Sequence, residues 1–573
     1  MTDAPSGMRK GLANYGDAEF SLFLRKAFIK AMGYSDSALD RPIVGITNTF
    51  SGYNACHRNV PDLIEAIKRG VMLAGGLPIE FPIVSIHESF SHPTSMFLRN
   101  LMAMDAEEMI RAQPMDSVVL IGGCDKTVPA LLMAAASVDL PAIMEVTGPM
   151  ITGSYRGERL GACTDCRRFW AMHRAGTVSG AETEEISGKL APGPGTCMVM
   201  GTASTMALVT EALGMMLPGG AAIPAVNADR LRHAEATGAR AVALAAEKLK
   251  PSDIMTEAAF GNALRVLQAI GGSTNGLVHL TAIAGRLGID IDLGAFDRMG
   301  KETPVLVDLK PSGQHYMEDL EKAGGLTPVI REIEAMLDTG CRTVSGRTLG
   351  ENIADAPVPW PQDVVRPLAE PIHQGGGIRV LGGNLAPNGA IIKQAAATAS
   401  LLKHAGRAVV FDSLRDLAER IDSPDLDVAP DDILVLRNAG PKGAPGMPEA
   451  GYIPIPKKLA AAGVKDMVRI SDARMSGTAF GTIVLHISPE AAVGGPLALV
   501  EDGDQISLDV AAGRIELLVR EATLAERRAN WRPPEIPGSG RGYLRLYLDQ
   551  VLQAEDGCDF DFLRKTPRRT DTA

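Results

Sequence analysis

A thiol, a carboxylate and an amine stand next to one another in the sequence at Cys124, Asp125 and Lys126. They follow an apolar run and two glycines, and a helical pattern begins directly after them at Thr127. This order predicts that a buried strand ends and a helix begins at the trio. Open α/β sheets bind ligands at the carboxyl ends of their strands. We therefore expect the trio to line a ligand site, although its position alone does not identify the ligand.

Two further cysteines, Cys56 and Cys197, share this setting. Each lies in a loop of polar residues or glycines, shortly before a predicted helix. The free N–H groups and the dipole at a helix N-terminus favour a thiolate. Because cysteine is also among the most buried residue types, each thiol on its own could equally be structural. Three thiols at the same kind of junction favour a functional role.

The pair Cys163 and Cys166 forms a C-x-x-C motif, "CTDC", a spacing found in zinc knuckles and dithiol redox pairs. No second C-x-x-C and no closely spaced histidine pair follows, and the flanking sequence does not resemble thioredoxin. We interpret both residues as buried structural thiols, with a functional role left open as the alternative.

Two carboxylates and a serine occupy comparable positions. Glu88 follows a predicted strand, and Glu449 ends a loop dense in glycine and proline. Carboxylates at strand ends can bind Mg²⁺, although a lone acid in a loop more often caps a helix or is solvated. Ser476, in "RMSGT" after another predicted strand, could present its hydroxyl to a ligand. Alone, each of these signals is weak.

The composition argues against several classes of protein. The net charge is −11, and no Lys/Arg cluster could neutralise a run of phosphates, so nucleic acid is not expected as a partner. The N-terminus lacks the apolar core of a signal peptide, and no long apolar stretch appears, so we expect a cytoplasmic protein with no membrane span. Seven cysteines, an odd number, do not form a disulfide framework in a chain of 573 residues.

The pattern of elements predicts two domains. Strand-like runs at 42–50, 79–85, 117–123 and 141–148 alternate with helical patterns such as 60–76 and 94–113, and mainly helical sequence follows up to 289. This rhythm predicts an α/β domain, residues 1–370, with a mostly parallel sheet covered on both faces.

After the proline-rich segment 355–371 the pattern changes to short β-like runs. They predict a second domain, residues 371–573, that forms a mixed β-barrel or sandwich and ends in a helix over 541–557. These runs are 377–383, 407–411, 432–440, 466–473, 481–488 and 514–519.

Seven motifs in order resemble the dihydroxy-acid and sugar-acid dehydratase family of iron–sulfur enzymes. The resemblance runs through nearly the whole chain, and the order of the motifs is highly specific. They are "NACH", "HESF", "GGCDKT", "PGPGTCMVMGTASTM", "GGSTNGLVHL", "NAGPKGAPGMPE" and "SDARMSGT".

This resemblance implies an N-terminal α/β domain and a C-terminal β-barrel, packed as homodimers or homotetramers. It also implies an iron–sulfur cluster whose three thiolate ligands leave one iron open as a Lewis acid. The implied cluster ligands are Cys56, Cys124 and Cys197. The implied Mg²⁺ ligands are Glu88, Asp125, Lys126 and Glu449. Lys126 would have to be carbamylated, because an ammonium group has no lone pair for a cation.

The same resemblance assigns Ser476 as the base that removes the C2 proton of a 2,3-dihydroxy carboxylate, and Thr478 could bind the substrate carboxylate. The product would be a 2-keto-3-deoxy acid plus water. A serine hydroxyl is too weak a base unaided, so Mg²⁺ would have to stabilise its alkoxide. The sequence "TCMVMGTAST" resembles the aldonate branch, which favours a pentonate or similar sugar acid as substrate and a [2Fe–2S] cluster. Three cysteines alone would suit a two-iron or a four-iron cluster, and dihydroxyisovalerate is the alternative substrate.

Two other classes of function were weighed. A nicotinamide-dependent oxidoreductase on a doubly wound sheet would need G-x-G-x-x-G after the first strand, where the chain reads "GITNTFSGYNAC". A non-catalytic zinc-binding or scaffold protein would rest on Cys163 and Cys166 alone. Visible absorbance from a thiolate-bound cluster would separate the dehydratase from both.

Overall fold

The strands predicted in the N-terminal part form one parallel sheet. The computed structural model describes residues 6–566. The strand order is β2-β1-β3-β4, and all three pairings are parallel. The α/β prediction is therefore confirmed. The strands are β1 (Ile43–Asn48), β2 (Leu77–Pro82), β3 (Ser117–Gly122) and β4 (Ala142–Val146).

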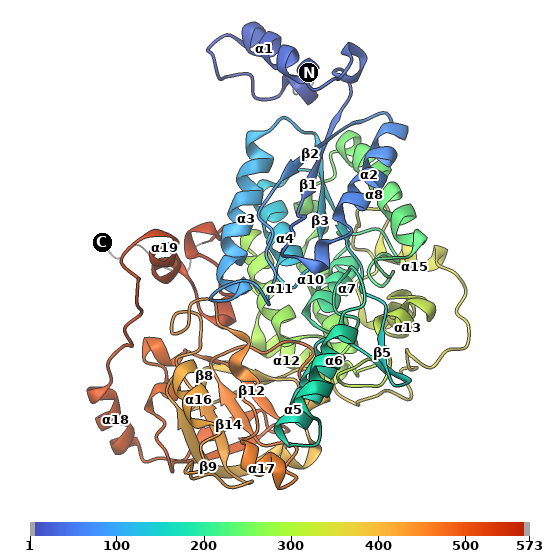
Figure 1. Cartoon of the computed structure of the whole chain (residues 1–573). Coiled ribbons are helices and arrows are strands. Elements are labelled where there is room, and N and C mark those ends of the chain that lie inside the picture. The colour runs from blue at the N-terminus through green and yellow to red at the C-terminus, as the bar shows by residue number, and fades with distance from the viewer. Residues whose placement is uncertain (1–5, 567–573) are drawn as a thin grey trace.

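Helices cover both faces of this sheet (Figure 1). α2 (Val60–Leu73) and α8 (Ala228–Glu247) pack together on one face, and α3 (Ser95–Ala112) and α4 (Thr127–Val138) lie on the other. α2 and α8 approach so closely that a Cβ on Gly238 would lie 2.2 Å from the carbonyl oxygen of Ile67. A glycine is needed at this contact because no other residue leaves room for the neighbouring backbone.

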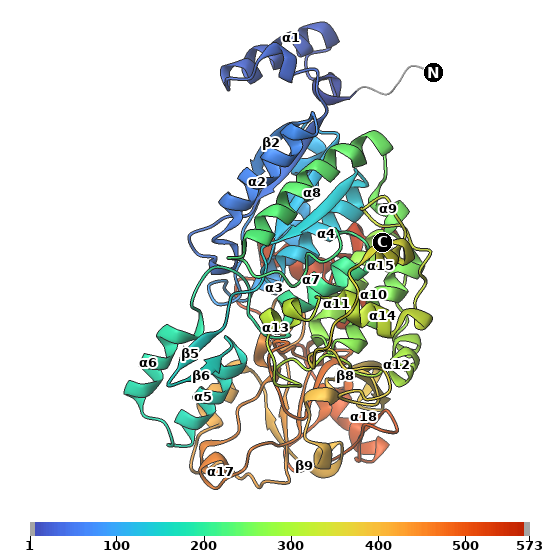
Figure 2. The same cartoon turned by 90° about the vertical axis from the view of Figure 1, so that its right-hand side faces the viewer.

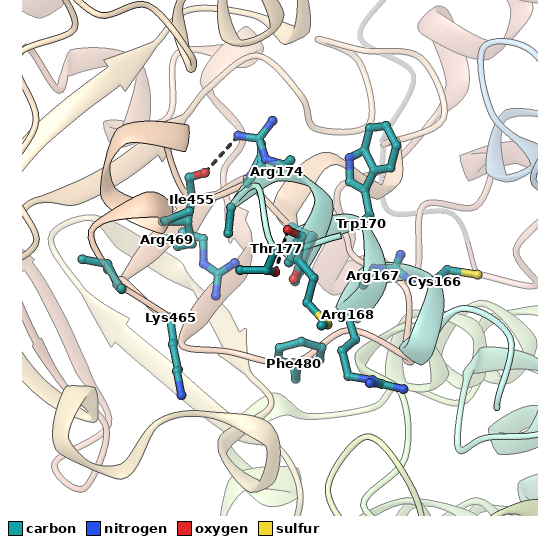
Figure 3. A pocket seen from close by; sticks show the side chains of 18 of the residues that line it. Cys166, Arg167, Arg168, Trp170, Arg174, Thr177, Ile455, Lys465, Arg469 and Phe480 are labelled. Atoms are coloured by element: carbon teal, nitrogen blue, oxygen red, sulfur yellow. Dashed lines mark hydrogen bonds between the residues drawn. The ribbon is translucent and has the colours of Figure 1, made fainter. Parts of the chain in front are cut away.

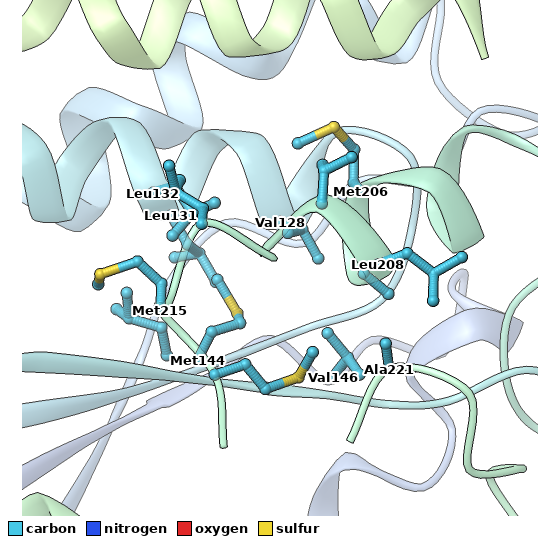
Figure 4. Packing of buried hydrophobic residues seen from close by; sticks show 14 of the residues in the cluster. Val128, Leu131, Leu132, Met144, Val146, Met206, Leu208, Met215 and Ala221 are labelled. Atoms are coloured by element: carbon cyan, nitrogen blue, oxygen red, sulfur yellow. The ribbon is translucent and has the colours of Figure 1, made fainter. Parts of the chain in front are cut away.

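The helix that follows the Cys124–Lys126 trio is anchored in the core. Val128 and Leu132 of α4 pack with Met144 of β4 and with Met206 and Leu208 of α7 (Thr202–Ala212), and all five side chains are fully buried (Figure 4). Protein interiors of this kind are close-packed and resist deformation. The N-terminus of α4 is therefore held in a fixed position relative to the end of β3.

Further helices extend the N-terminal part away from the sheet. A hairpin and two helices form a separate projection, which reaches toward the second domain (Figure 2). The projection consists of β5 (Gly153–Tyr155), β6 (Glu158–Leu160), α5 (Thr164–Arg174) and α6 (Gly180–Leu190). α1 (Ala18–Ala31) stands at the opposite end of the molecule. The remaining helices are α9 (Pro251–Ile254), α10 (Glu257–Ala269), α11 (Thr274–Arg286), α12 (Leu293–Glu302), α13 (Met317–Lys322), α14 (Thr327–Glu332) and α15 (Leu349–Asp355).

The C-terminal part is a closed barrel of eight strands in the order β10-β11-β12-β8-β7-β14-β13-β9. It contains four parallel and four antiparallel pairings, so it is a mixed barrel, as predicted. The strands are β7 (Arg379–Gly383), β8 (Ala386–Ile392), β9 (Lys403–Phe411), β10 (Ile433–Leu436), β11 (Arg469–Ser471), β12 (Ile483–Ser488), β13 (Gln505–Asp509) and β14 (Arg514–Leu517). Its helices are α16 (Leu414–Arg420), α17 (Lys457–Ala461), α18 (Glu521–Asn530) and α19 (Gly542–Gln550).

The sequence analysis did not find two of these strands, β8 and β13. β8 reads "APNGAII", and its proline, asparagine and glycine indicate a turn when read locally. Pairing with β7 on one side and β12 on the other makes the segment a strand. Both missing strands are needed to close the barrel.

The two parts share a continuous core. Ile378, Ile391 and Met475 of the C-terminal part belong to the same buried cluster as the residues of the parallel sheet. The domain boundary near residue 370 stays a prediction.

The closing segment is shorter as a helix than predicted. α19 ends at Gln550 instead of 557, because Val551 turns to an extended conformation and pairs with Phe560. The following residues return to the N-terminal part, where Arg99 donates hydrogen bonds to the carbonyls of Gly557 and Cys558 at 2.8 and 3.0 Å. Within residues 6–566, no helix is long and apolar enough to cross a membrane.

Candidate active site

Two of the three predicted cluster cysteines lie together beside the end of β3. Cys124 follows β3 directly, and Cys56 comes from the short 3₁₀ turn Ala55–His57 that follows β1. Their sulfurs and a ring nitrogen of His87 all lie within 4.8 Å of one another. Burial and a hydrogen bond with Cys124 raise the pKa of the Cys56 thiol. Sulfur and imidazole ligands at this spacing suit a soft or borderline metal ion or an iron–sulfur cluster.

His57 fixes the loop that carries Cys124. Its Nδ1 lies 2.8 Å from the carbonyl oxygen of Thr49, and its Nε2 accepts hydrogen bonds from the backbone N–H groups of Gly123 and Cys124, each at 3.1 Å. Burial lowers the pKa of His57 to about 4, so the ring is neutral. A neutral ring with its proton on Nδ1 satisfies all three contacts. The sequence analysis missed this residue, and its place beside Cys56 in "NACH" is the signal that could have indicated it.

The third predicted ligand, Cys197, lies next to a thiol that was not expected there. The sulfurs of Cys163 and Cys197 are 3.0 Å apart. A hydrogen bond with Cys163, together with burial, raises the pKa of the Cys197 thiol, and Cys56 contributes to the same shift. Cys163 and Cys166, interpreted from the sequence as buried structural thiols, are only partly buried and line a cavity.

The raised pKa values of Cys56 and Cys197 oppose the expectation from the sequence that these thiols ionise readily. A helix N-terminus favours a thiolate, but burial and shared protons outweigh that effect at Cys56 and Cys197. A bound cation would be needed to keep these sulfurs deprotonated.

A cluster of carboxylates and cations lies beside the thiols. The Lys126 ammonium, fully buried, is 3.5 Å from Glu88 and 3.6 Å from Asp125. Arg474 joins Glu88 to Glu449, with hydrogen bonds of 3.0 Å to both oxygens of Glu88 and 2.6 Å to Glu449. The structure thus brings all four predicted Mg²⁺ ligands into contact through Arg474 and Lys126. Arg474, a residue of "SDARMSGT", was not singled out from the sequence.

The pKa values of two carboxyl groups in this cluster, Glu88 and Glu449, are shifted in opposite directions. Burial raises the pKa of Glu88, but Arg474 and Lys126 lower it by more, and the net result lies well below the usual range. Burial and the nearby Glu88 carboxylate raise the pKa of Glu449. A divalent cation between these carboxylates would relieve their mutual repulsion, so the donor set fits Mg²⁺.

Lys126 is the least satisfied member of the cluster. Its Nζ is buried and makes no hydrogen bond among the described residues, although two carboxylates lie within 4 Å. A buried polar atom without a hydrogen bond is costly and requires an explanation. Carbamylation would convert this nitrogen from an unpaired donor into the base of an oxygen ligand.

Ser476 and Thr478 form a hydroxyl pair at the tip of a loop that follows β11. Their side-chain oxygens are 2.8 Å apart, and both residues are buried. The loop is held by hydrogen bonds from both parts of the chain. Asn275 of α11 donates to the carbonyl of Met475 at 2.9 Å, and the Lys393 ammonium donates to the carbonyl of Gly477 at 3.0 Å.

Packing leaves no room for a side chain at Gly477. A Cβ there would lie 2.5 Å from the Cβ of Ser273, at the N-terminus of α11. Lys393, from the end of β8, is also fully buried, and burial lowers the pKa of its amine to about 7. The loop is therefore fixed by rigid neighbours, which suits a side chain that must act at a defined position.

Arg167 of α5 connects the hydroxyl pair to the other two groups. Its Nη1 donates to Thr478 Oγ1 at 2.8 Å and to the carbonyl of Cys163 at 3.0 Å, and its Nη2 lies 3.9 Å from Glu449. The guanidinium therefore links the hydroxyl pair to the Glu449 carboxylate and to the backbone of Cys163, beside the thiols. The sequence analysis did not identify Arg167, which shares the "CTDCRR" segment with the two cysteines.

A cavity of about 950 Å³ opens beside this guanidinium, between α5 and the barrel (Figure 3). Its walls combine apolar side chains such as Trp170 and Phe480 with cationic ones such as Arg174 and Lys465, and none of the described residues that line it is acidic. A low-dielectric cleft with charges of one sign raises the local concentration of ligands of the opposite sign. Arg174 is paired with Asp422 and Arg469 with Asp466, so only part of this positive charge is available to an anion in the cavity.

Comparison with known proteins agrees with this geometry. The model of the dihydroxy-acid/6-phosphogluconate dehydratase N-terminal domain matches residues 41–352, and that of the C-terminal domain matches residues 363–558. The chain belongs to this dehydratase family. The family resemblance found from the motifs is confirmed, and the family's activity makes the chain an enzyme, a hydro-lyase.

Three relatives illustrate the range of substrates named in the dehydratase family. The chain is 48% identical to the L-arabinonate dehydratase of Rhizobium leguminosarum bv. trifolii, over 96% of this chain and 95% of that protein. It is 46% identical to the 6-deoxy-6-sulfo-D-gluconate dehydratase of Pseudomonas putida, over 92% and 91% of the two chains. It is 40% identical to the dihydroxy-acid dehydratase of Syntrophobacter fumaroxidans, over 93% and 96%. These relatives support the dehydration of sugar acids over that of dihydroxyisovalerate, and dehydratases of this family depend on metal.

Proposed function

We propose that this dehydratase converts a 2,3-dihydroxy sugar acid, a pentonate or a similar aldonate, to the 2-keto-3-deoxy acid and water. The observation that carries the proposal is the convergence at Arg167, which contacts Thr478 of the hydroxyl pair, the Glu449 carboxylate and the backbone carbonyl of Cys163, whose sulfur lies against Cys197. Elimination of water from such a substrate needs a base at C2, a positive site for the carboxylate, and an acid for the leaving hydroxyl. The hydroxyl pair can supply the base, whereas the carboxylates and thiols would hold the metal groups that supply the positive site and the Lewis acid.

Ser476 is the proposed base. Thr478 Oγ1 accepts the hydrogen bond from Arg167, so its own proton is free to point toward Ser476 Oγ, 2.8 Å away. This chain of donors runs from a permanent cation to the serine oxygen and would stabilise the alkoxide that the proton transfer requires. Thr478 then acts as a hydrogen-bond donor to Ser476, and we propose that the same side chain contacts the substrate carboxylate.

The metal groups are assigned on the same basis. We propose that Cys56, Cys124 and Cys197 hold an iron–sulfur cluster of the [2Fe–2S] type. Glu88, Asp125, Glu449 and carbamylated Lys126 would hold Mg²⁺. When bound, the cluster supplies a Lewis acid for the departing hydroxyl, and Mg²⁺ supplies a positive charge for the carboxylate and the 2-hydroxyl. Arg474, already bonded to Glu88 and Glu449, would orient the two carboxylates toward the ion.

The surroundings of the site support an acidic substrate. Arg167 and the cationic lining of the cavity favour an anion over a neutral sugar. The site also lies at the contact between the two parts of the chain, since Arg167 comes from the projection and Ser476 from the barrel part. A homodimer or homotetramer and a cytoplasmic location remain proposals.

A substrate panel tests the proposed function. Protein purified without oxygen, loaded with iron and Mg²⁺, would be assayed for 2-keto acid release from pentonates, hexonates and 2,3-dihydroxyisovalerate. We expect release from at least one aldonate, at a higher kcat/KM than from dihydroxyisovalerate. Preference for dihydroxyisovalerate would favour the branched-chain alternative, and no release from any of them would refute the proposal.

A further inference from the structure

Cys163 is a thiol beside the proposed cluster ligands that the proposed function does not use. Its sulfur lies 3.0 Å from that of Cys197, closer than two unbonded sulfurs normally pack. Its neighbour in the C-x-x-C motif behaves differently, because Cys166 Sγ accepts a hydrogen bond from the Cys163 backbone N–H at 3.2 Å. Cys166 therefore helps to cap α5, and Cys163 is directed toward the cluster cysteines.

The backbone at Cys163 is held in a conformation that disfavours a side chain. Its φ is +73°, in the left-handed region where glycine is the usual residue. Such strain persists only where the surroundings enforce it, and it is concentrated at functional sites. Here the enforcing contacts come from both following residues. Thr164 donates to the carbonyl of Thr478 at 3.0 Å, and Asp165 accepts from the N–H of Gly161 at 2.7 Å.

The position of Cys163 is also distinctive. It lines the cavity beside Arg167, and at the same time contacts a predicted cluster ligand. A group that exchanges with substrate must reach both the metal and the space that the substrate enters. Cys163 is the residue of the described chain whose sulfur contacts Cys197 and whose surface faces the cavity.

We propose that Cys163 is an exchangeable fourth thiol of the cluster site, bound in the absence of substrate and released when the substrate arrives. This inference rests on the proposed function. On binding, the thiol would give its proton to water and its sulfur would replace the water at the open position; on release, a substrate hydroxyl would replace the sulfur, which takes a proton back from water, so no electron is transferred. Three thiolates hold the cluster throughout, and the fourth would protect its open position from other ligands.

Thiol labelling of the iron-loaded enzyme tests the proposal. Native protein would be treated with iodoacetamide under anaerobic conditions, and labelling of Cys163 and Cys166 would be resolved by peptide fragmentation. Cys166 is the internal control, because it lies on the same cavity wall and is similarly exposed. Relative to Cys166, we expect Cys163 to react about tenfold or more slowly with the cluster present than after its removal by a chelator. Addition of the aldonate that is turned over should raise the relative rate again.

A pair of variants provides the second measurement. Cys163→Ser should keep its iron but shift the g-values of the reduced cluster in the substrate-free enzyme, whereas Cys166→Ser should match the wild type. Equal labelling of the two cysteines in the iron-loaded enzyme, or unchanged g-values in Cys163→Ser, would overturn the inference while the dehydratase remained active. Loss of all iron from Cys163→Ser would show a permanent ligand and would also overturn exchange. An enzyme that binds no iron at all would refute the proposed function together with this inference.

Discussion

Replacement of Lys393 by methionine should stabilise this protein at pH 6 and reduce its activity. The Lys393 ammonium is fully buried, and burial lowers the pKa of the amine from 10.5 to about 7, with no carboxylate of the described residues contributing to the shift. Its one hydrogen bond runs to the carbonyl of Gly477, next to Ser476. A buried cation without a counter-charge destabilises the folded protein. Such a residue is therefore expected only where the site needs it.

The magnitude follows from the difference between the two pKa values. In the unfolded chain the amine titrates near its ordinary 10.5, and in the folded protein near 7. At about 1.4 kcal/mol for each pKa unit, the buried charge costs on the order of 5 kcal/mol below pH 7. Between pH 7 and 10.5 the unfolded state binds more protons than the folded state, so this cost disappears as the pH rises. Loss of the hydrogen bond to Gly477 would offset roughly 1–3 kcal/mol of the gain in Lys393→Met at every pH.

The assay is a comparison of apparent melting temperatures of Lys393→Met and wild type from pH 6 to pH 10. We expect the variant to melt higher at pH 6 and lower at pH 10, because the wild-type amine is neutral there and keeps its hydrogen bond. Lys322→Met, at an exposed position, is the matched control and should show a difference that does not change with pH. Turnover of Lys393→Met should fall, since the carbonyl that anchors the Ser476 loop loses its donor.

A constant difference between Lys393→Met and wild type at all pH values would refute this reasoning. A packing defect would shift every melting temperature by a similar amount, so it cannot imitate a crossing of the two curves. Only the titration of a buried amine produces a difference that changes sign between pH 6 and pH 10.

Four other outcomes are expected. Ser476→Ala should keep its iron and its fold and lose turnover by roughly 10²–10⁴-fold, the usual effect of removing a general base, and near wild-type turnover would point to another base. Cys124→Ser should lose most of its iron, measured per chain, and full iron content would remove it from the ligand set. Lys126→Ala should lose Mg²⁺ and activity, with partial rescue by small carboxylic acids, and an unmodified lysine seen by mass spectrometry in active enzyme would exclude carbamylation. Arg167→Gln should lower kcat and shift the pH profile of kcat upward, because the serine loses the positive charge that acts through Thr478, and an unchanged profile would exclude that route.

The local sequence pattern was sufficient to predict those strands whose apolar residues match the faces that are buried in the structure. The parallel strands β1, β3 and β4 are mainly apolar because both of their faces are buried, and the run itself therefore indicates a strand. β8 shows the limit of such patterns. Its proline and glycine indicate a turn, and only pairing with two neighbours in a closed barrel makes it a strand.

The motifs of the sequence likewise determined the family and the types of residue that the chemistry needs. The predicted cluster thiols, the predicted Mg²⁺ ligands and the hydroxyl pair all stand in those motifs, because the chemistry of a site restricts its residue types and their local spacing. No local pattern, however, shows which side chains these residues contact. Arg474 reaches Glu88 across 386 residues of sequence, and Lys393 reaches Gly477 across 84.

The tertiary structure alone decided how these groups contact one another. Cys163 and Cys197 are 34 residues apart, and the strained turn before α5 brings their sulfurs to 3.0 Å. Arg167 meets Thr478 across 311 residues, because the projection folds back against the barrel part. Side-chain contacts of this range depend on how whole elements pack, and packing is set by surfaces far apart in the chain. The sequence by itself therefore determined which chemistry is available, and the packing of α5 against the barrel part determined which groups perform it together.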